Sequence, residues 1–508
     1  MQLRFRHIAR NVFSNWFATG ANMAVGFFLA PFIVHHLGNA AYGVWVLAIS
    51  SVNYLGLLDL GMRSSVLRFV SKGHAVGDHA GASDALSAAL WVRLQISGLV
   101  LLIAGTLAYL FPRLFHVPAE LAHQAQIAVM IIGLTTGLSM SLGVFGGVLS
   151  GLNRYDLQSI ATLVQLVMRA SGVVWLLLHG YGIVAVAICE FVATLAYSLL
   201  TMMIARRIYP QLTISLAKPK PGVLRSLWSY SFYAFLTTIA IQLVYQTDNL
   251  VVGTFVSTTA VTFYSIGNSL CRYTDQFTGS MTLTFVPAAS SYESAGDSAK
   301  LKELYRMGTR ALMTICLPIL VSLIFRGRNF IGLWMGPQYM KESGTVLIIL
   351  ACALLFSQTN NPAGAIAFGV SKHKTTARWA IGEGIANLTL SVILVHWMGL
   401  YGVALGTLIP SLVVNVGLWP RFIAKLIGIS VGEILFEIWG PMFVAAVPFA
   451  VGSYLVNAYA PAHNLVTFFV ETLLLLPLFL VGVAVVFRDQ VREFVLPKIR
   501  SFFQPSAA

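Results

Sequence analysis

The sequence predicts an all-α integral membrane protein with about fourteen transmembrane helices, and three observations support this fold class. Residues of the AVILMFWYC set make up 57% of the chain and charged residues only 10%, and the mean hydropathy is +0.79. Soluble domains carry about 25% charged residues, so this chain has too few to cover a water-facing surface. The apolar residues also form runs of about 20, the length that crosses about 30 Å of hydrocarbon.

Fourteen such runs can be placed along the chain, and none shows the period-two alternation of a membrane β-barrel. The first is expected to be a retained span, because its apolar part is too long for a signal sequence and lacks a small-x-small cleavage site. The predicted spans are 13–36, 41–62, 82–110, 123–150, 158–178, 183–205, 228–254, 259–287, 308–332, 344–369, 380–398, 401–420, 436–458 and 465–487.

The basic residues predict the orientation of these spans, because cytoplasmic loops hold the excess of Lys and Arg. With the N-terminus in the cytoplasm, 25 of the 32 Lys and Arg residues fall on the cytoplasmic side. Only Arg113, Arg326, Arg328 and Lys341 fall on the outer side. Both termini are therefore expected in the cytoplasm, and the net charge of +14 is read mainly as a topological signal that also attracts anionic headgroups.

Two sequence echoes predict an internal repeat. LHGYGIVAVA at 178–187 is echoed by HWMGLYGVALG at 396–406, and Gly77-Asp78 is echoed by Gly296-Asp297 at nearly the same offset. A shift of six spans preserves orientation, which favours two parallel, pseudosymmetric six-helix lobes. The predicted division is an N-terminal lobe at 1–205, a cytoplasmic linker at 206–227, a C-terminal lobe at 228–422, and two extra spans with a tail at 423–508.

Three arginines lie near the middle of predicted spans, where a charge costs at least ~2.5 kcal/mol and usually faces a partner or a lumen. They are Arg93, Arg169 and Arg272. Arg272 has Asp275 one helical turn away, so an intrahelical pair is one interpretation. Arg93 and Arg169 have no acid at that spacing, so they either pair with a distant acid such as Glu190 or Asp248 or form a cationic, phosphate-binding lumen.

The acidic residues divide by depth. Asp59 lies at the end of span 2 with Arg63 four residues on, which favours a structural pair. Glu190 and Asp248 lie deeper, in spans 6 and 7, and are candidates for a proton- or ion-coupling site or for partners of the arginines. Glu471 lies in span 14, outside both lobes, and is assigned no role.

Uncharged polar residues gather in two spans. Span 10 reads SQTNNPAGAIAFG, and its proline predicts a helix break beside Gln358, Asn360 and Asn361. Broken helices at membrane depth are tolerated when they are buried in protein or line a cavity, so the break is either a structural kink or a lumen feature. Span 7 offers Gln242, Tyr245 and Gln246 as further lumen-lining groups that suit sugars.

The sequence contains no P-loop, HExxH, GxSxG or water-exposed Gly-rich phosphate loop, so we expect a non-enzyme. Its four cysteines lie in apolar runs without metal-ligand spacing, and neither a metal nor a bound cofactor is expected. The loops are too short for an ATPase domain. Any transport would therefore be driven by an H⁺ or Na⁺ gradient, the membrane potential or mass action.

The N-terminal stretch 35–73 resembles the first loop and second span of bacterial polysaccharide flippases, in which LG-x-x-x-YG-x-W, then L-D-x-G and R-F-V-(S/A) recur. GVLSGLNRYDL at 147–157 and GYGIVAVAICEF at 180–191 resemble later features of the same family. That family belongs to a superfamily that also holds multidrug extruders and lipid II flippases. The resemblance covers about the first 210 residues, and the second half fits chiefly in topology.

This resemblance implies translocation of an undecaprenyl-diphosphate-linked oligosaccharide from the inner to the outer leaflet of the bacterial cytoplasmic membrane by alternating access. The product would serve O-antigen, capsule or exopolysaccharide synthesis. The expected partners are the lipid-linked glycan, membrane lipids, and a polysaccharide polymerase with its chain-length machinery; nucleic acid is not expected. A cationic lumen fits a diphosphate, which needs compensating charge to cross hydrocarbon.

Three other classes remain as alternatives. An ion-coupled multidrug extruder would usually have twelve spans and often an acid in span 1, which here has none. A membrane glycosyltransferase acting on the same lipid carrier would normally show a larger outer domain or a catalytic loop. A non-transporting scaffold would not need charges in its spans.

Overall fold

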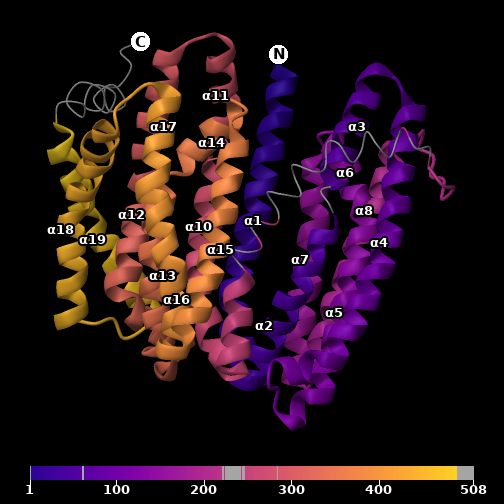
Figure 1. Ribbon diagram of the computed structural model, residues 1–508, viewed down its shortest axis with the longest axis horizontal. Coiled ribbons are helices and arrows are strands. Elements are labelled where there is room, and N and C mark those ends of the chain that lie inside the picture. Colours follow the sequence, from indigo (N-terminus) through magenta and orange to yellow (C-terminus); the bar gives the residue numbers. More distant parts are fainter. Residues whose placement is uncertain are drawn as a thin grey trace, which may run out of the picture. The chain divides into compact units, whose positions relative to one another are not determined.

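The computed structural model describes residues 2–59, 62–219, 222, 239, 242, 246–282 and 284–488. The regular secondary structure in these ranges is helical throughout (Figure 1), which confirms the all-α prediction. Twelve helices of the described chain are long and apolar enough to cross a membrane. Predicted span 8 corresponds to α10 (Thr258–Thr282), which is too polar to be among the twelve. Predicted span 7 lies largely outside the described residues, so a total of fourteen stays a prediction.

The chain divides into two compact units, residues 1–262 and 263–508. The bounds of the predicted lobes stay a prediction, because residues 220–245 are mostly outside the described ranges. The helices of the first unit are α1 (Gln2–Leu37), α2 (Asn39–Asn53), η1 (Tyr54–Asp59), α3 (Met62–Val76), α4 (His79–Leu114), α5 (Ala119–Leu142), α6 (Val144–Gly151), α7 (Tyr155–Leu178) and α8 (Ile183–Ile208).

In the first unit, long helices of alternating direction pack side by side. Helix α4 lies along α5, α5 along α8, and α7 packs between α8 and α1. A hydrophobic core joins α3, α4, α6 and α8, with Val66, Leu86 and Leu149 fully or almost fully buried. These helices therefore form a bundle that can hold a charged side chain away from lipid.

The LG-x-x-x-YG motif has a structural explanation within this unit. Gly38, with φ of +79°, makes the left-handed turn between α1 and α2, which residues with a side chain rarely adopt. A Cβ at Gly43 would lie 1.8 Å from the backbone oxygen of Thr258, so glycine lets α2 touch the chain at the start of α10. The Thr262 hydroxyl adds a hydrogen bond of 2.7 Å to the Asn39 carbonyl. These residues fix the packing of α2.

The longest helix described in the second unit is α12 (Ser298–Met335), with 38 residues. It packs against α13, α18 and α19, and the core around it includes Ile366, Ile438 and Phe449. The other elements that follow α10 in this unit are α11 (Phe285–Ser294), η2 (Pro337–Tyr339), α13 (Glu342–Thr359), α14 (Asn361–Gly369), α15 (His373–Met398), α16 (Leu400–Leu412), η3 (Val413–Leu418), α17 (Trp419–Ile427), η4 (Glu433–Trp439), α18 (Gly440–Tyr459) and α19 (Leu465–Val486).

Both sequence echoes fall on matching local structures. Gly77 and Gly296 have φ of +75° and +68°, and each is followed by an aspartate that caps a long helix, α4 or α12. The capped amides are Gly81 N, at 2.8 Å from Asp78 Oδ1, and Lys300 N, at 3.0 Å from Asp297 Oδ1. Hydrogen bonds from the side chain and amide of Lys300 hold the pKa of Asp297 below its usual value, so the carboxylate caps α12 at neutral pH.

The second echo lies in two helical hairpins. Residues 178–187 contain the turn between α7 and α8, and residues 396–406 contain the turn between α15 and α16. Each hairpin packs its two helices against each other within its own unit. The echoes therefore mark equivalent turns and caps, as expected for a repeat.

Candidate functional site

The first charged site of the first unit connects α4 with η1, the 3₁₀ segment that ends predicted span 2. Arg93 has a side chain that is only 3% exposed, and it forms an ion pair with Asp59, the last residue of η1. The sequence suggested Glu190, Asp248 or an open lumen for Arg93, and the structure corrects this by placing Asp59 beside it. The side chain of Arg63, the partner expected for Asp59, lies outside the described residues.

Small and hydroxylated residues lie one helical turn from Arg93 and at the adjoining end of α5. The Ser97 hydroxyl, one turn further along α4, donates 2.8 Å to the Gly137 carbonyl and lies 2.7 Å from the Ser141 hydroxyl. A Cβ at Gly143 would lie 3.6 Å from Arg93 Nη1, which is ordinary contact distance. The interface of α4 with α5 and α6 is thus polar at its centre and accommodates a guanidinium.

The second charged site of this unit is the pair of Arg169 on α7 and Glu190 on α8. Their closest atoms, Arg169 Nε and Glu190 Oε2, are 3.9 Å apart, and the two side chains are 32% and 28% exposed. Glu190 is one of the partners that the sequence offered for the arginines. At this distance the contact is electrostatic rather than a hydrogen bond, so both groups keep hydrogen-bonding capacity for a ligand.

The polar residues of predicted span 7 contact the end of α2. Gln242 Nε2 donates 3.0 Å to the Asn53 carbonyl, and Asn249 Nδ2 donates 3.1 Å to the Ser50 hydroxyl. The Tyr54 hydroxyl lies 2.5 Å from Thr247 Oγ1, where span 2 changes from α-helix to 3₁₀-helix. Asp248 and Gln246 are buried, and Tyr245 lies outside the described residues. A lumen-lining role for Gln242, Tyr245 and Gln246 stays a prediction.

In the second unit, a chain of side chains leads from α10 to the break in span 10. Asp275 Oδ1 accepts a hydrogen bond of 2.8 Å from Gln358 Nε2. Gln358 Oε1 in turn accepts one of 2.5 Å from Asn361 Nδ2. Arg272 lies one turn before Asp275 on α10 and is partly buried. Of the two residues predicted beside the Pro362 break, Gln358 thus bonds the α10 carboxylate directly, and Asn361 reaches it only through Gln358.

The break itself lies at Asn360, between α13 and α14. Asn360 Nδ2 donates 2.9 Å to the Asn415 carbonyl, and Asn415 Nδ2 donates to Ser411, at 3.1 Å from its hydroxyl. Asn415 belongs to η3, a π-helical turn that carries its own irregular backbone. Two helix irregularities therefore face each other, and Asn360 donates to the irregular turn at Asn415, which supports the structural-kink interpretation for Asn360.

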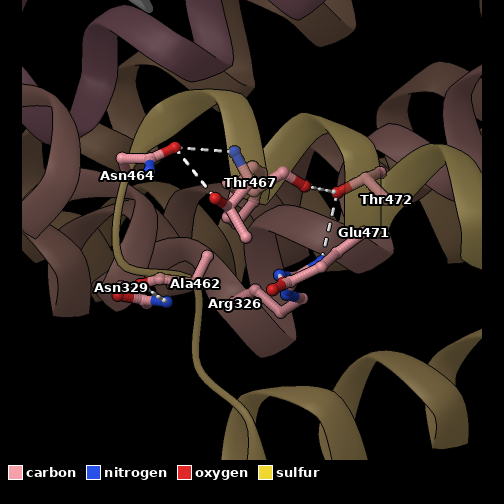
Figure 2. A network of polar contacts seen from close by, with 8 residues as sticks. Arg326, Asn329, Ala462, Asn464, Thr467, Glu471 and Thr472 are labelled. Carbon is pink, nitrogen blue, oxygen red and sulfur yellow. Dashed lines mark hydrogen bonds and ion pairs between the residues drawn. The ribbon is translucent and has the colours of Figure 1, made fainter.

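A further intramembrane ion pair was missed by the sequence interpretation. Arg326 on α12 was assigned to the outer side and Glu471 on α19 was given no role, but the two form an ion pair in which the Arg326 side chain is fully buried (Figure 2). Arg326 also donates 3.1 Å to the Thr472 hydroxyl and lies 4.3 Å from the centre of the Phe468 ring. Both charges lie in apolar runs of the sequence, and a charge in such a run is the signal that could have identified this pair.

The arrangement is suited to handling charge inside a membrane. Three arginine–carboxylate pairs join different candidate membrane spans: Arg93–Asp59, Arg169–Glu190 and Arg326–Glu471. Within the described ranges, no group of three or more His, Cys, Asp or Glu residues could hold a metal ion.

Comparison with known proteins places this geometry in a family. Residues 32–344 match the family described as polysaccharide biosynthesis protein. The uncharacterized membrane protein EpsK of Bacillus subtilis is 24% identical over 82% of this chain and 83% of its own length. A Haloferax volcanii protein, Agl15, described as a probable low-salt glycan biosynthesis flippase, is 23% identical over 83% and 85%.

The fold also has a solved counterpart. The lipid II flippase MurJ, in an inward closed conformation, superposes with a TM-score of 0.72 at 13% identity, over 95% of this chain and 99% of that one. At this identity the likeness concerns the fold alone. The family match spans more than half of the chain, including the α2 motif, the Arg93 and Arg169 sites and all of α12. The chain therefore belongs to the polysaccharide biosynthesis protein family, as a multi-pass membrane protein.

Proposed function

We propose that this protein is a flippase that carries a lipid-diphosphate-linked oligosaccharide from the cytoplasmic to the outer leaflet of the bacterial cytoplasmic membrane. The observation that carries the proposal is the family match over residues 32–344. Agl15, which is similar over most of this chain, is described as a glycan flippase. The carrier would be undecaprenyl diphosphate and the product O-antigen, capsule or exopolysaccharide, delivered to a polymerase with its chain-length machinery.

The intramembrane charges support an anionic cargo. A diphosphate carries about two negative charges, and its passage through hydrocarbon requires compensating cations. The Arg169 side chain on α7 is 32% exposed, and Arg272 on α10 is partly buried. Arg93, by contrast, is enclosed beside Asp59. We assign diphosphate contact to Arg169 in the first unit and to Arg272 in the second, and to Arg93 the support of the helices around Asp59 in the first unit. Alternating access would present these groups to each leaflet in turn.

Complementation of a flippase-null strain, with analysis of the surface glycan, tests the function directly. The wild-type chain should restore the polymer. Failure with every glycan background tested, despite normal insertion of the protein, would contradict a flippase role.

Removal of the partly exposed arginines should strongly reduce export. We expect Arg169→Ala and Arg272→Ala each to lower surface polymer at least about ten-fold, because one charge-assisted hydrogen bond to phosphate contributes roughly 1.5–3 kcal/mol. Immunoblots should show normal amounts of protein. Arg113→Ala, an exposed arginine at the end of α4, is the matched control and should leave polymer unchanged. Normal polymer from Arg93→Ala, Arg169→Ala, Arg272→Ala and the triple variant would refute the cationic passage.

Ion coupling is proposed at the carboxylates of the first unit. Glu190 pairs loosely with Arg169, and Asp248 is buried, so protonation or cation binding at either would alter the local charge balance. In proteoliposomes, Glu190→Gln and Asp248→Asn should lose the response of transport to an imposed H⁺ or Na⁺ gradient. Glu120→Gln, an exposed acid in the first turn of α5, is the control. If transport ignores both substitutions and the gradients, coupling at these residues is wrong.

A further inference from the structure

The chain stays on the first unit after α8 ends at Ile208. We call residues 209–217 the linker strap, because they lie near the start of the predicted linker at 206–227. Tyr209 is only 2% exposed and belongs to the hydrophobic core of α3, α4, α6 and α8, and Leu212 and Ile214 pack against the same core. The strap is therefore part of the first unit rather than a free loop.

Two serines on α4 bind the backbone of the strap. Ser83 Oγ accepts a hydrogen bond of 3.1 Å from the amide of Thr213, and Ser87 Oγ accepts one of 3.0 Å from the amide of Ser215. Ser87 Oγ also donates toward the Thr213 carbonyl at 3.5 Å. Two residues of extended chain advance about 6.6 Å, and four residues of helix advance about 6 Å. Alternate strap amides thus match serines one helical turn apart.

Tyr209 fixes the start of the strap. Its hydroxyl lies 2.6 Å from His79 Nδ1, in the first turn of α4. The rings of His74 and His79 lie edge-on to it, at 5.3 and 5.4 Å between centroids. Burial raises the pKa of the Tyr209 hydroxyl, with the charge of Asp78 adding to the effect, so the group keeps its proton at neutral pH and can donate to the imidazole.

We propose that the linker strap is a permanent anchor that stays docked on α4 during transport and limits how far the chain that follows residue 227 can move from α4. The predicted linker ends at residue 227. Without docking, residues 209–227 could span roughly 65 Å, whereas residues 218–227 alone reach at most about 35 Å. Docking therefore halves the reach of the connection. The limit on movement during transport rests on the proposed function, whereas the docking itself does not.

Hydrogen exchange of the full-length purified protein tests the docking. The amides of Thr213 and Ser215 should be protected in the wild type and should exchange at least about ten-fold faster in the Ser83→Ala/Ser87→Ala variant, which removes both acceptors. Thr106→Ala is the matched control, because this hydroxyl on α4 bonds only the Leu102 carbonyl of its own helix among the contacts in the described chain. Exchange that is equally fast in the wild type and in the double variant would overturn the docking.

A disulfide tests the permanence. Because Ser215 N and Ser87 Oγ are 3.0 Å apart, cysteines at 87 and 215 are close enough to be cross-linked. The oxidised Ser87→Cys/Ser215→Cys variant should transport within about two-fold of its reduced form, with Ser87→Cys alone as the control. Arrest that reduction relieves would show that the strap must undock, which overturns the proposal. If even the wild type carries no lipid-linked glycan, the proposed function fails while the exchange result on docking still holds.

Discussion

Replacing Glu471 by glutamine is expected to lower the free energy of unfolding by about 3–5 kcal/mol, the cost of leaving a buried charge without its partner. The residue left behind is Arg326, whose side chain is fully enclosed between α12 and α19. The second hydrogen bond of Arg326, to Thr472, and its contact with Phe468 remain, but neither neutralises the guanidinium charge. Thermal unfolding in detergent, with the remaining folded protein quantified by size-exclusion chromatography, measures the effect.

Two comparisons isolate the cause of this loss. The apolar pair Arg326→Met/Glu471→Leu removes both charges and should recover most of the stability, since replacing a buried pair by apolar residues is often neutral or better. Arg306→Ala breaks a second pair on the same helix, with Glu433, in which the arginine is 41% exposed. That loss should be below about 1 kcal/mol. Equal losses from Glu471→Gln and Arg306→Ala would contradict the role of burial.

The Arg326 pair has a structural consequence for the two extra spans. Asn329 on α12 donates 3.3 Å to the Ala462 carbonyl, in the turn between α18 and α19. Asn464 caps α19 through the amide and hydroxyl of Thr467, at 2.8 and 2.9 Å (Figure 2). The turn and the helix it starts are thus held on α12 at several points. Spans 13 and 14 are attached to the second unit by specific polar contacts in addition to apolar packing.

Asp59→Asn is expected to lower stability more than Arg93→Met, although the two substitutions break the same ion pair. The Asp59 side chain is 25% exposed, so water can hydrate the carboxylate when the arginine is removed. The Arg93 side chain is 3% exposed, so a guanidinium that loses its carboxylate stays largely dehydrated, at a cost of roughly 3–5 kcal/mol. Thermal unfolding in detergent gives the order of the two losses.

Export adds a second measurement for this pair. Because Asp59 ends η1, where span 2 leaves the α-helical conformation, loss of the pair should also loosen that break and reduce surface polymer. The double variant Arg93→Met/Asp59→Asn should recover stability without recovering full export. If Asp59→Asn folds and exports like the wild type, the pair supports neither the break nor the transport path.

Residues of the first unit explain why the family motif has its particular glycines. Gly43 is required by the approach of α2 to Thr258, a contact between residues more than two hundred positions apart. The sequence identified the motif, but nothing near position 43 indicates what it touches. A similar close approach occurs at Gly253, outside that motif, where a Cβ would lie 2.4 Å from Leu47 Cδ2. Local pattern identifies such a glycine, and only the packed structure gives its reason.

The sequence by itself determined the fold class, because composition and run length are set by the thickness of the membrane and need no tertiary information. It also located the helix break beside Pro362, since proline cannot donate to the preceding turn, and the repeated Gly-Asp caps at 77–78 and 296–297. It selected Arg93 and Arg169 as costly charges that need partners. These are local or average properties of the chain.

Only the tertiary structure decided which charges meet. Arg93 pairs with Asp59 on a separate helical segment, and Arg326 with Glu471, 145 residues away. Sequence spacing reveals partners one turn apart on a helix, as proposed for Asp59 with Arg63, but pairing between helices depends on which faces pack together. That packing follows from shape and burial over whole helices, so the sites could be shortlisted from the sequence but not assembled from it.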